Sequence, residues 1–352
     1  MPGGDSIIYE KRIINRDQLC DMLDAFDLRD VENADYTVGI FDEQRLVGFG
    51  SLSGDIISGV VVNIEDQNKG ISAKIISHLI NVAIEHGTST VHLFTKPEKA
   101  HFFTSLGFRL LATAPSCAAM LEWGDTALAF YLKQLQGQAF DGHPEAAAII
   151  LHANPFTNGH KYLIERAADE NKYLYVIVVE ENQSLFSFDV RFTLAKKCTA
   201  HLPNVLVLPG GRYSVSPLTF PSYFTQENRL AETHASIDLA LFSSHIAPAL
   251  NIKARYIGTE PYNEVTHIYN EIMKQFLPTQ GIHVTEVPRI NVGGETVSAS
   301  AVRHLLVEPE LSEPCTIRLR SLVPPPTYAF IVDHWNQLVY QSAELQKRRS
   351  AR

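Results

Sequence analysis

The sequence predicts an α/β protein of two domains, an α+β domain followed by a doubly wound domain built on a parallel sheet. Length is the first reason, because 352 residues exceed what one ordinary hydrophobic core organises. Second, strand-like and helix-like segments alternate at short intervals in the later part of the chain, as in open parallel sheets. Third, the earlier strands include a tight hairpin, which joins antiparallel neighbours. We expect domains at 1–124 and 145–330, a connecting helix and linker at 125–144, and a basic C-terminal tail at 331–352.

The first domain should contain an antiparallel or mixed sheet. Two strand-like runs flank Asp42-Glu43, which is typical of a hairpin. A later run of apolar residues at helical spacing, including Ile75, Ile76 and Leu79, predicts a helix with one buried side. The expected elements are a strand at 6–14, a helix at 16–26, strands at 36–41, 45–52 and 56–64, a helix at 71–86 and the connecting helix at 125–135.

The second domain begins with a strand and a helix that matter for function. Residues Ala146–His152 are almost wholly apolar and too short for a core helix, so they predict a strand buried on both faces. Asn154-Pro155-Phe156 ends that strand, and Thr157 is a good N-cap for the amphipathic helix that follows. Further strands are expected at 173–179, 205–208, 254–258 and 283–287.

Composition and charge are those of a soluble globular protein, with 45% hydrophobic and 20% charged residues. The net charge of −9 argues against nucleic acid as an obligate partner. The first residues lack the apolar core of a signal peptide, and no apolar run approaches the roughly 20 residues of a membrane helix. We therefore expect a cytoplasmic protein without membrane association. Neither a zinc site nor a disulfide framework is predicted, because the cysteines lie far apart without a C-x-x-C pair: Cys20, Cys117, Cys198 and Cys315.

The turn after the first parallel strand is predicted to bind phosphate. A helix N-terminus directs free N–H groups and the positive end of a dipole toward an anion. Gly159 lets a ligand approach the backbone, and His160 can donate a hydrogen bond to a phosphorus transition state. T-x-G-H could also be an ordinary N-cap followed by a surface histidine. Its position between a buried strand and a helix favours the functional interpretation.

A second predicted helix N-terminus gathers two hydroxyls and a cation. The segment Val297–Arg303 (V-S-A-S-A-V-R) follows two glycines, and Ser298 is a plausible cap. Arg303 suits the β- and γ-phosphates of a nucleotide, since its donor fork matches phosphate oxygens. By itself, S-x-S-x-x-R is equally compatible with a capped helix that bears a solvated arginine.

Together the two motifs resemble the signatures of the nucleotidylyltransferase superfamily, [TH]-x-G-H and I-S-x-[ST]-x-[IVL]-R, with Val297 in place of isoleucine. Longer strings are similar to those of the citrate lyase ligase family: N-P-F-T-N-G-H-K-Y-L, F-S-F-D-V-R at 186–191, T-F-P-S-Y-F at 219–224 and Y-I-G-T-E-P at 256–261. The likeness extends over nearly the whole chain, because that family also carries an acetyltransferase-like N-terminal domain. His152 stands where the family pattern leads us to expect asparagine.

This resemblance implies an ATP-dependent acetate ligase with a Rossmann-like catalytic domain. It would form acetyl-AMP and diphosphate, then acetylate the thiol of the phosphoribosyl-dephospho-CoA prosthetic group on the acyl-carrier subunit of citrate lyase, which activates that enzyme. Mg²⁺ would arrive with ATP, and no metal ligands are assigned. Catalytic roles are expected for Thr157, His160 and Arg303. ATP binding is expected of His152, Asn154, Pro155, Phe156, Gly159, Lys161, Gly258, Glu260, Ser298 and Ser300, and substrate binding of Arg191 and Tyr213.

The first domain resembles the GCN5-related N-acetyltransferases. Gln67-x-x-Gly70-x-Ser72 lies between a strand and a helix, as the pyrophosphate loop [QR]-x-x-G-x-[GA] of that family does, although Ser72 departs from its last position. No general base is identified. The domain could therefore be an active acetyltransferase, a fold kept without acetyl transfer, or a holder of the partner's phosphopantetheine-like arm.

Three other functions are open at this point. An adenylyltransferase would leave AMP on phosphopantetheine or a mononucleotide, and its ATP–pyrophosphate exchange would depend on a phosphate-bearing acceptor instead of acetate. An acetyl-CoA-dependent N-acetyltransferase would work without ATP. A non-catalytic scaffold that binds the carrier would leave both phosphate motifs unexplained. The ligase interpretation requires the Thr157 turn and the Ser298 turn to meet at one site.

Overall fold

The computed structural model describes most of the chain, namely residues 8–9, 16–24, 34–43, 45–114, 118–124, 127–181, 184–214, 230–261, 263–308 and 310–350. The T-F-P-S-Y-F string at 219–224, Cys117 and most of the strand expected at 6–14 lie outside these residues. The chain divides into two compact units, the first made of Met1–Ala129 and Phe220–Leu241 and the second of Phe130–Thr219 and Phe242–Arg352.

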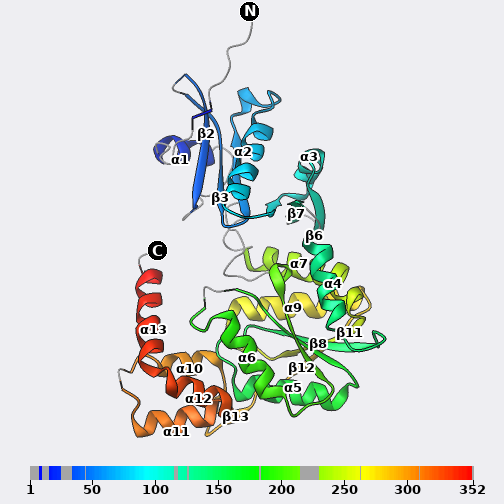
Figure 1. Ribbon diagram of the computed structural model, residues 1–352, viewed down its shortest axis with the longest axis vertical. Helices are drawn as coiled ribbons and strands as arrows, with labels where there is room; N and C mark the ends of the chain where they lie inside the picture. The colour runs from blue at the N-terminus through cyan, green and yellow to red at the C-terminus, as the bar shows by residue number, and fades with distance from the viewer. Residues whose placement is uncertain are drawn as a thin grey trace, which may run out of the picture. The chain divides into compact units, whose positions relative to one another are not determined.

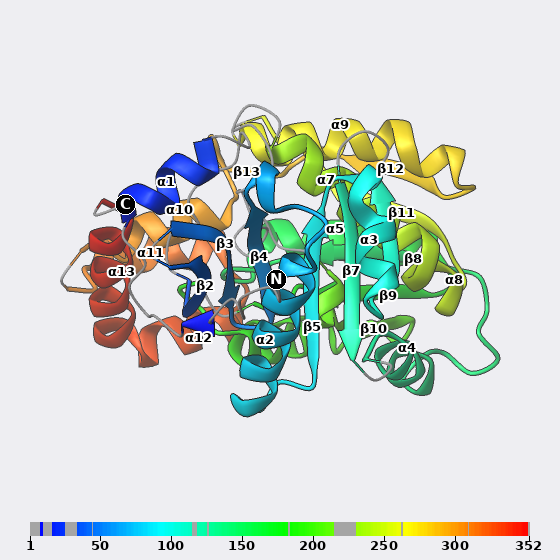
Figure 2. The same ribbon diagram turned by 90° about the horizontal axis from the view of Figure 1, so that it is seen from above.

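The first unit is built on a mixed seven-stranded sheet in the order β1-β2-β3-β4-β5-β7-β6 (Figures 1 and 2). Neighbouring strands are antiparallel except β4 and β5, which pair in parallel at Ile56–His92 and Ile57–Leu93. Helix α7, which comes from a later part of the chain, packs against β6 and β7. The strands are β1 (Ile8–Tyr9), β2 (Tyr36–Asp42), β3 (Arg45–Ser53), β4 (Ile56–Val62), β5 (Thr90–Thr95), β6 (Arg109–Ala114) and β7 (Ala118–Gly124). The helices are α1 (Arg16–Asp24), η1 (Ile64–Asp66), α2 (Ile71–Glu85), η2 (Pro97–Lys99), α3 (Ala100–Ser105) and α7 (Leu230–Leu241).

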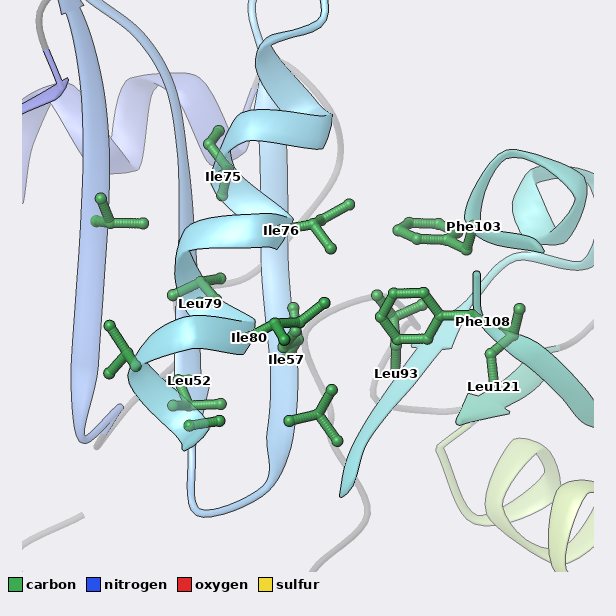
Figure 3. Close-up of a cluster of buried hydrophobic side chains, with 14 of the residues drawn as sticks. Leu52, Ile57, Ile75, Ile76, Leu79, Ile80, Leu93, Phe103, Phe108 and Leu121 are labelled. Atoms are coloured by element: carbon green, nitrogen blue, oxygen red, sulfur yellow. The ribbon is translucent and has the colours of Figure 1, made fainter. Parts of the chain in front are cut away.

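Helix α2 supplies the main apolar face of the first unit. Its side chains Ile75, Ile76, Leu79 and Ile80 are buried against the sheet (Figure 3). The helix comes close because Gly50 faces it, and a Cβ there would lie 2.6 Å from Ile75 Cγ2. The amphipathic spacing in the sequence thus predicted this packing correctly.

Two ionisable side chains, His92 and Glu122, are buried in the same sheet. His92 Nδ1 lies 3.0 Å from an Asp55 carboxylate oxygen, and Nε2 lies 3.4 Å from Glu122. Arg109 pairs with the other oxygen of Glu122 at 2.8 Å. Burial by itself would lower the pKa of His92, but the hydrogen bonds and charges of the two carboxylates outweigh it and raise that pKa above 6.5.

The second unit is a doubly wound domain with a five-stranded parallel sheet in the order β10-β9-β8-β11-β12. From β8 the chain moves outward through β9 to β10, then returns to the other side of β8 for β11 and β12. The carboxyl ends of β8 and β11 therefore flank the switch point where such sheets bind ligands. The strands are β8 (Ala146–Leu151), β9 (Leu174–Val178), β10 (Val205–Pro209), β11 (Ile252–Gly258) and β12 (His283–Val287), with a small hairpin of β13 (Asn291–Val292) and β14 (Glu295–Thr296). The helices before the C-terminal region are α4 (Ala127–Gly137), α5 (Asn158–Glu170), α6 (Phe188–Thr199), η3 (Gly211–Tyr213), η5 (Phe242–Ile246), α8 (Ala247–Ala249) and α9 (Glu264–Thr279).

Four C-terminal helices complete the second unit and gather beside one another (orange to red in Figure 1). They share a core with Leu185 and Phe186, which follow β9. The basic tail expected at 331–352 is largely helical and packed, since Trp335 and Leu338 are 5% and 4% exposed. None of the described helices has the length and apolar content to cross a membrane. The four are α10 (Ala299–Leu305), α11 (Glu313–Leu322), α12 (Pro325–Asp333) and α13 (Trp335–Ser350).

Candidate active site

The Thr157 turn begins α5 with a reciprocal cap. The Thr157 hydroxyl accepts a hydrogen bond from the backbone N–H of His160, at 3.4 Å. In return the backbone N–H of Thr157 donates to His160 Nδ1 at 3.0 Å. Because Nδ1 is an acceptor, the ring proton of the neutral imidazole is on Nε2. The turn therefore fixes both the orientation of the ring and its tautomer.

His160 is neutral near pH 7. The pKa of this half-buried ring is lowered to about 4, chiefly by burial and then, in that order, by the positive charges of Arg289, His152 and Arg303. The ring therefore acts as a neutral hydrogen-bond donor through Nε2.

The Ser298 turn begins α10 in a similar way. Ser298 Oγ accepts from the backbone N–H of Ala301 at 3.0 Å. Arg303 donates from Nη2 to Ser300 Oγ at 2.9 Å and from Nη1 to the carbonyl of Asn154 at 2.6 Å. The arginine thus joins its own helix to the strand end that precedes Thr157.

The two turns lie against each other. A Cβ placed on Gly159 would lie 3.1 Å from the carbonyl oxygen of Val297, so only glycine fits there without a shift. The Arg303–Asn154 hydrogen bond spans 149 positions of sequence. Asn158, beside Thr157, also donates to the carbonyl of Ser321 in α11 at 2.9 Å. The structure therefore brings both motifs to one edge of the parallel sheet, as the ligase interpretation requires.

The end of β11 forms a further part of this edge. A Cβ on Gly258 would meet no atom within 4 Å, so space is open in front of this residue. Glu260 does not face that space freely, because its carboxylate is 8% exposed, pairs with Arg289 and accepts from the backbone N–H of Asn263 at 3.1 Å.

Arg289 was missed from the sequence. It follows β12, where its Nε donates to the carbonyl of Thr259 at 2.6 Å and its Nη2 pairs with Glu260. Its only sequence signal is a basic residue just after a strand of a parallel sheet, and such residues are common on protein surfaces.

Arg191 requires a correction, because the structure does not present it to a ligand. Its side chain is 0% exposed and donates to the backbone carbonyls of Phe186, His152, Val179 and Glu181, at 3.0, 2.7, 2.8 and 2.5 Å. It also lies 3.5 Å from the Glu181 carboxylate. The guanidinium therefore fastens the loops that follow β8 and β9.

Tyr213 also differs from expectation. It is 3% exposed, and its ring centroid lies 5.2 Å from that of Tyr131 in α4. Phe156 is 0% exposed and packs in the sheet core, so only its backbone could contact a nucleotide. Pro155 is buried as well.

Two other residues expected to bind ATP, Lys161 and His152, are partly exposed. Lys161 is 37% exposed and lies 3.6 Å from Glu165 on the same helix. His152 is 38% exposed and lies 3.8 Å from Glu181.

The fold and the two converging turns define a nucleotidylyltransferase-like domain joined to an acetyltransferase-like α+β unit, which confirms the predicted fold class. The family model for the citrate lyase ligase C-terminal domain matches residues 146–331. The [citrate [pro-3S]-lyase] ligase of Klebsiella pneumoniae is 37% identical to this chain over 295 residues, which cover 82% of this chain and 84% of that protein. The chain belongs to the citrate lyase ligase family.

Two further relatives bear the name of this family. The [citrate [pro-3S]-lyase] ligase of Escherichia coli (strain K12) is 31% identical over 94% of this chain and 95% of that protein. The protein of the same name from Haemophilus influenzae is 34% identical over 78% of this chain and 83% of that protein. Among solved structures, N-acetylglutamate synthase from Neisseria gonorrhoeae, complexed with coenzyme A and N-acetyl-glutamate, is 14% identical over 35% of this chain and 36% of that chain, with a TM-score of 0.30.

Proposed function

We propose that this protein joins acetate to AMP at the expense of ATP and then acetylates the prosthetic-group thiol on the acyl-carrier subunit of citrate lyase. Family membership supports the overall reaction. The observation that carries the proposal is the contact between the Thr157 turn and the Ser298 turn, seen at Gly159 and Val297. A triphosphate needs donors on more than one side, and two turns that meet at one sheet edge can supply them.

The residues at this edge fit a nucleotide. Gly159 has no side chain that would block the turn, and the space in front of Gly258 is open. Arg303 and Arg289 place positive charge within reach of the neutral His160. Mg²⁺ would arrive with the phosphates and would need no protein cage.

The first step is an in-line displacement at the α-phosphorus. A carboxylate oxygen of acetate forms the new P–O bond, the bond to the bridging oxygen breaks, and pyrophosphate leaves with the electron pair. His160 would donate its Nε2–H to the phosphate oxygen on which charge develops, and Thr157 would hold the ring in that orientation. Ser298, Ser300 and Arg303 would bind the leaving pyrophosphate.

The second step transfers the acetyl group. The sulfur of the carrier's prosthetic group attacks the acetyl carbonyl carbon, the bond between that carbon and the phosphate oxygen breaks, and AMP leaves. The thiol proton passes to solvent. We expect this reaction in the cytoplasm, with no nucleic acid or membrane as partner.

The limits of the functional parts are also proposals. We place the nucleotidylyltransferase domain at 145–330 and the acetyltransferase-like domain at 1–124. The match of the family model to 146–331 supports the first of these limits.

The decisive test uses deacetylated citrate lyase. Incubation with this protein, ATP and acetate should restore lyase activity, with one AMP formed for each acetyl group, and omission of ATP should prevent it. Exchange of pyrophosphate into ATP that depends on a phosphate-bearing acceptor instead of acetate would favour the adenylyltransferase alternative.

A paired substitution tests the role of His160. His160→Ala should lower acetate-dependent ATP–pyrophosphate exchange by about 10²- to 10³-fold, as loss of a preorganised donor does. His201→Ala is the control, because His201 is 50% exposed and pairs only with Glu165 among the described residues. Full exchange activity in the His160 variant would remove this residue from the mechanism.

A further inference from the structure

Arg289 is a cation that neither sequence motif accounts for. Its side chain is 26% exposed, and the Nε–Nη2 edge of the guanidinium is taken up by Thr259 and Glu260. In the part of the chain that the structure describes, no acceptor is bound to its Nη1. One edge is therefore fixed in place while a charged amino group is left for another partner.

The backbone places Arg289 between the separate parts of the site. Ile290, the next residue, accepts a hydrogen bond from the backbone N–H of Val297 at 3.1 Å, which joins this segment to the Ser298 turn. On its other side Arg289 is bound to residues 259–260 at the end of β11. Its charge acts on the pKa of His160 more strongly than that of Arg303 does. Arg289 is thus held at the end of β11, next to a residue that is bonded to the Ser298 turn, and its charge reaches His160 in the Thr157 turn.

We propose that Arg289 binds the α-phosphoryl group of the nucleotide and that Glu260 positions it. This inference rests on the proposed function. Arg303, which donates to the carbonyl of Asn154, belongs to the group that we propose binds the leaving pyrophosphate, and the open space at Gly258 is where adenosine would bind. The α-phosphoryl group is the part of ATP that links those two sides, so a cation held between them meets this group.

The position has a chemical consequence. When acetate attacks the α-phosphorus, negative charge on its non-bridging oxygens must be stabilised until pyrophosphate has left. Arg289 would stay with the same phosphorus through acetyl-AMP to AMP, whereas Arg303 would lose its ligand with pyrophosphate. The two arginines should therefore have separable effects.

Glu260 fits the role of a positioning residue. Its carboxylate is nearly buried and is itself fixed by the backbone N–H of Asn263, the N-cap of α9. It would hold the arginine fork rather than contact ATP, which revises the role expected from the sequence. The alternative is that the Arg289–Glu260 pair only clamps the ends of β11 and β12.

The test compares four single variants of the full chain: Arg289→Gln, Arg303→Gln, Glu260→Gln and, as control, Lys274→Ala. Lys274 is a matched clamp, because it joins α9 to β12 through Glu286 at 3.0 Å and lies outside the proposed site. AMP affinity is measured by calorimetry, pyrophosphate affinity by product inhibition, and kcat and KM for ATP by acetate-dependent exchange.

Arg289→Gln should weaken AMP binding about tenfold or more, the effect of one charge-assisted hydrogen bond. It should lower kcat about 10²-fold and leave pyrophosphate affinity within about twofold of wild type. Arg303→Gln should show the reverse pattern in the two affinities. Glu260→Gln should lower kcat about tenfold with little change in the KM for ATP, since the arginine keeps its charge but loses its fixed orientation. Lys274→Ala should match wild type in all of these.

AMP affinity within about twofold of wild type in Arg289→Gln would overturn the assignment in favour of a clamp. Arg289→Lys keeps the positive charge and serves if Arg289→Gln does not fold. The lysine variant should bind AMP more tightly than the glutamine variant. If both variants bound AMP equally weakly, that result would also count against the proposal. AMP titration does not require turnover of acetate. If wild type shows no acetate-dependent exchange, the proposed function fails while the AMP result still decides the role of Arg289.

Discussion

Replacing Arg191 by alanine should lower the free energy of unfolding of the second unit by about 4 kcal/mol, the cost of removing one partner from a buried ion pair. The guanidinium is fully buried, donates to four backbone carbonyls and lies 3.5 Å from Glu181. Each hydrogen bond from a charged group contributes roughly 1.5–3 kcal/mol, but the four share one side chain and are not additive. Water entering the gap recovers part of the loss, which brings the expected value toward that of a broken ion pair.

The measurement must isolate one unit, because a chain of two units does not unfold in a single step. The chain has two tryptophans, Trp123 in the first unit and Trp335 in the second. In a Trp123→Phe background, urea unfolding followed by fluorescence reports on the second unit through Trp335. The matched control is Arg166→Ala, because Arg166 is 56% exposed and pairs with Glu170 one helical turn away. That change should cost less than about 0.5 kcal/mol.

Lysine should not rescue Arg191, since a single ammonium cannot reach carbonyls on separate loops. The reasoning is refuted if Arg191→Ala unfolds within about 1 kcal/mol of wild type while its KM for acetate rises tenfold or more. Such a result would return Arg191 to the role of a substrate ligand that its motif implied.

Other predictions follow from single side chains. Gly159→Ala should lower ATP–pyrophosphate exchange at least about tenfold, because the new Cβ would lie 3.1 Å from a backbone oxygen of Val297 and misplace the turn. Gly258→Ala should leave the unfolding free energy unchanged but raise the KM for ATP, and an unchanged KM would take Gly258 out of the site. The pKa of His160 is about 4 in the folded state and 6.5 ordinarily, so between these pH values the unfolded state binds more protons than the folded state. The free energy of unfolding should therefore fall as the pH drops from 6.5 to about 4. In urea titrations, His160→Gln should make this pH dependence weaker. His92 affects stability in the opposite direction, because its pKa is raised above 6.5 in the folded state. Its contribution to the free energy of unfolding is complete below pH 6.5 and is lost as the pH rises through the folded-state pKa. If the stability of the first unit depended on pH in the same way in His92→Gln, this prediction would be contradicted.

Much of the parallel-sheet unit could be predicted, because its strands β8 and β9 are buried and consist of short apolar runs. The strand at 283–287 has the predicted limits, and β8 ends one residue earlier than expected. In the first unit, strands β5–β7 were not predicted. Strand β7 begins with two alanines and carries the buried Glu122, and both residue types are depleted in strands.

The site could be predicted where local structure determines it. Thr157 and Ser298 cap helices in the way their sequences indicate. Arg191 and Tyr213 could not be assigned correctly, because their burial depends on loops that are distant in sequence. Arg289 was missed for the same reason: its partners Thr259 and Glu260 come from another strand, and no motif marks the pairing.

The long sequence separations across the site affect the order in which the protein folds during synthesis. Asn154 accepts its hydrogen bond from Arg303, 149 positions later in the chain, and Asn158 donates to Ser321, 163 positions later. Closing such long loops comes late in folding, after the local strand and helix pairs have formed. We therefore expect that the parallel sheet of a nascent chain can fold before the contacts of Arg303 and Ser321 can form. A chain that ends before Arg303 and Ser321 would lack both contacts, so we expect it to be unable to activate acetate.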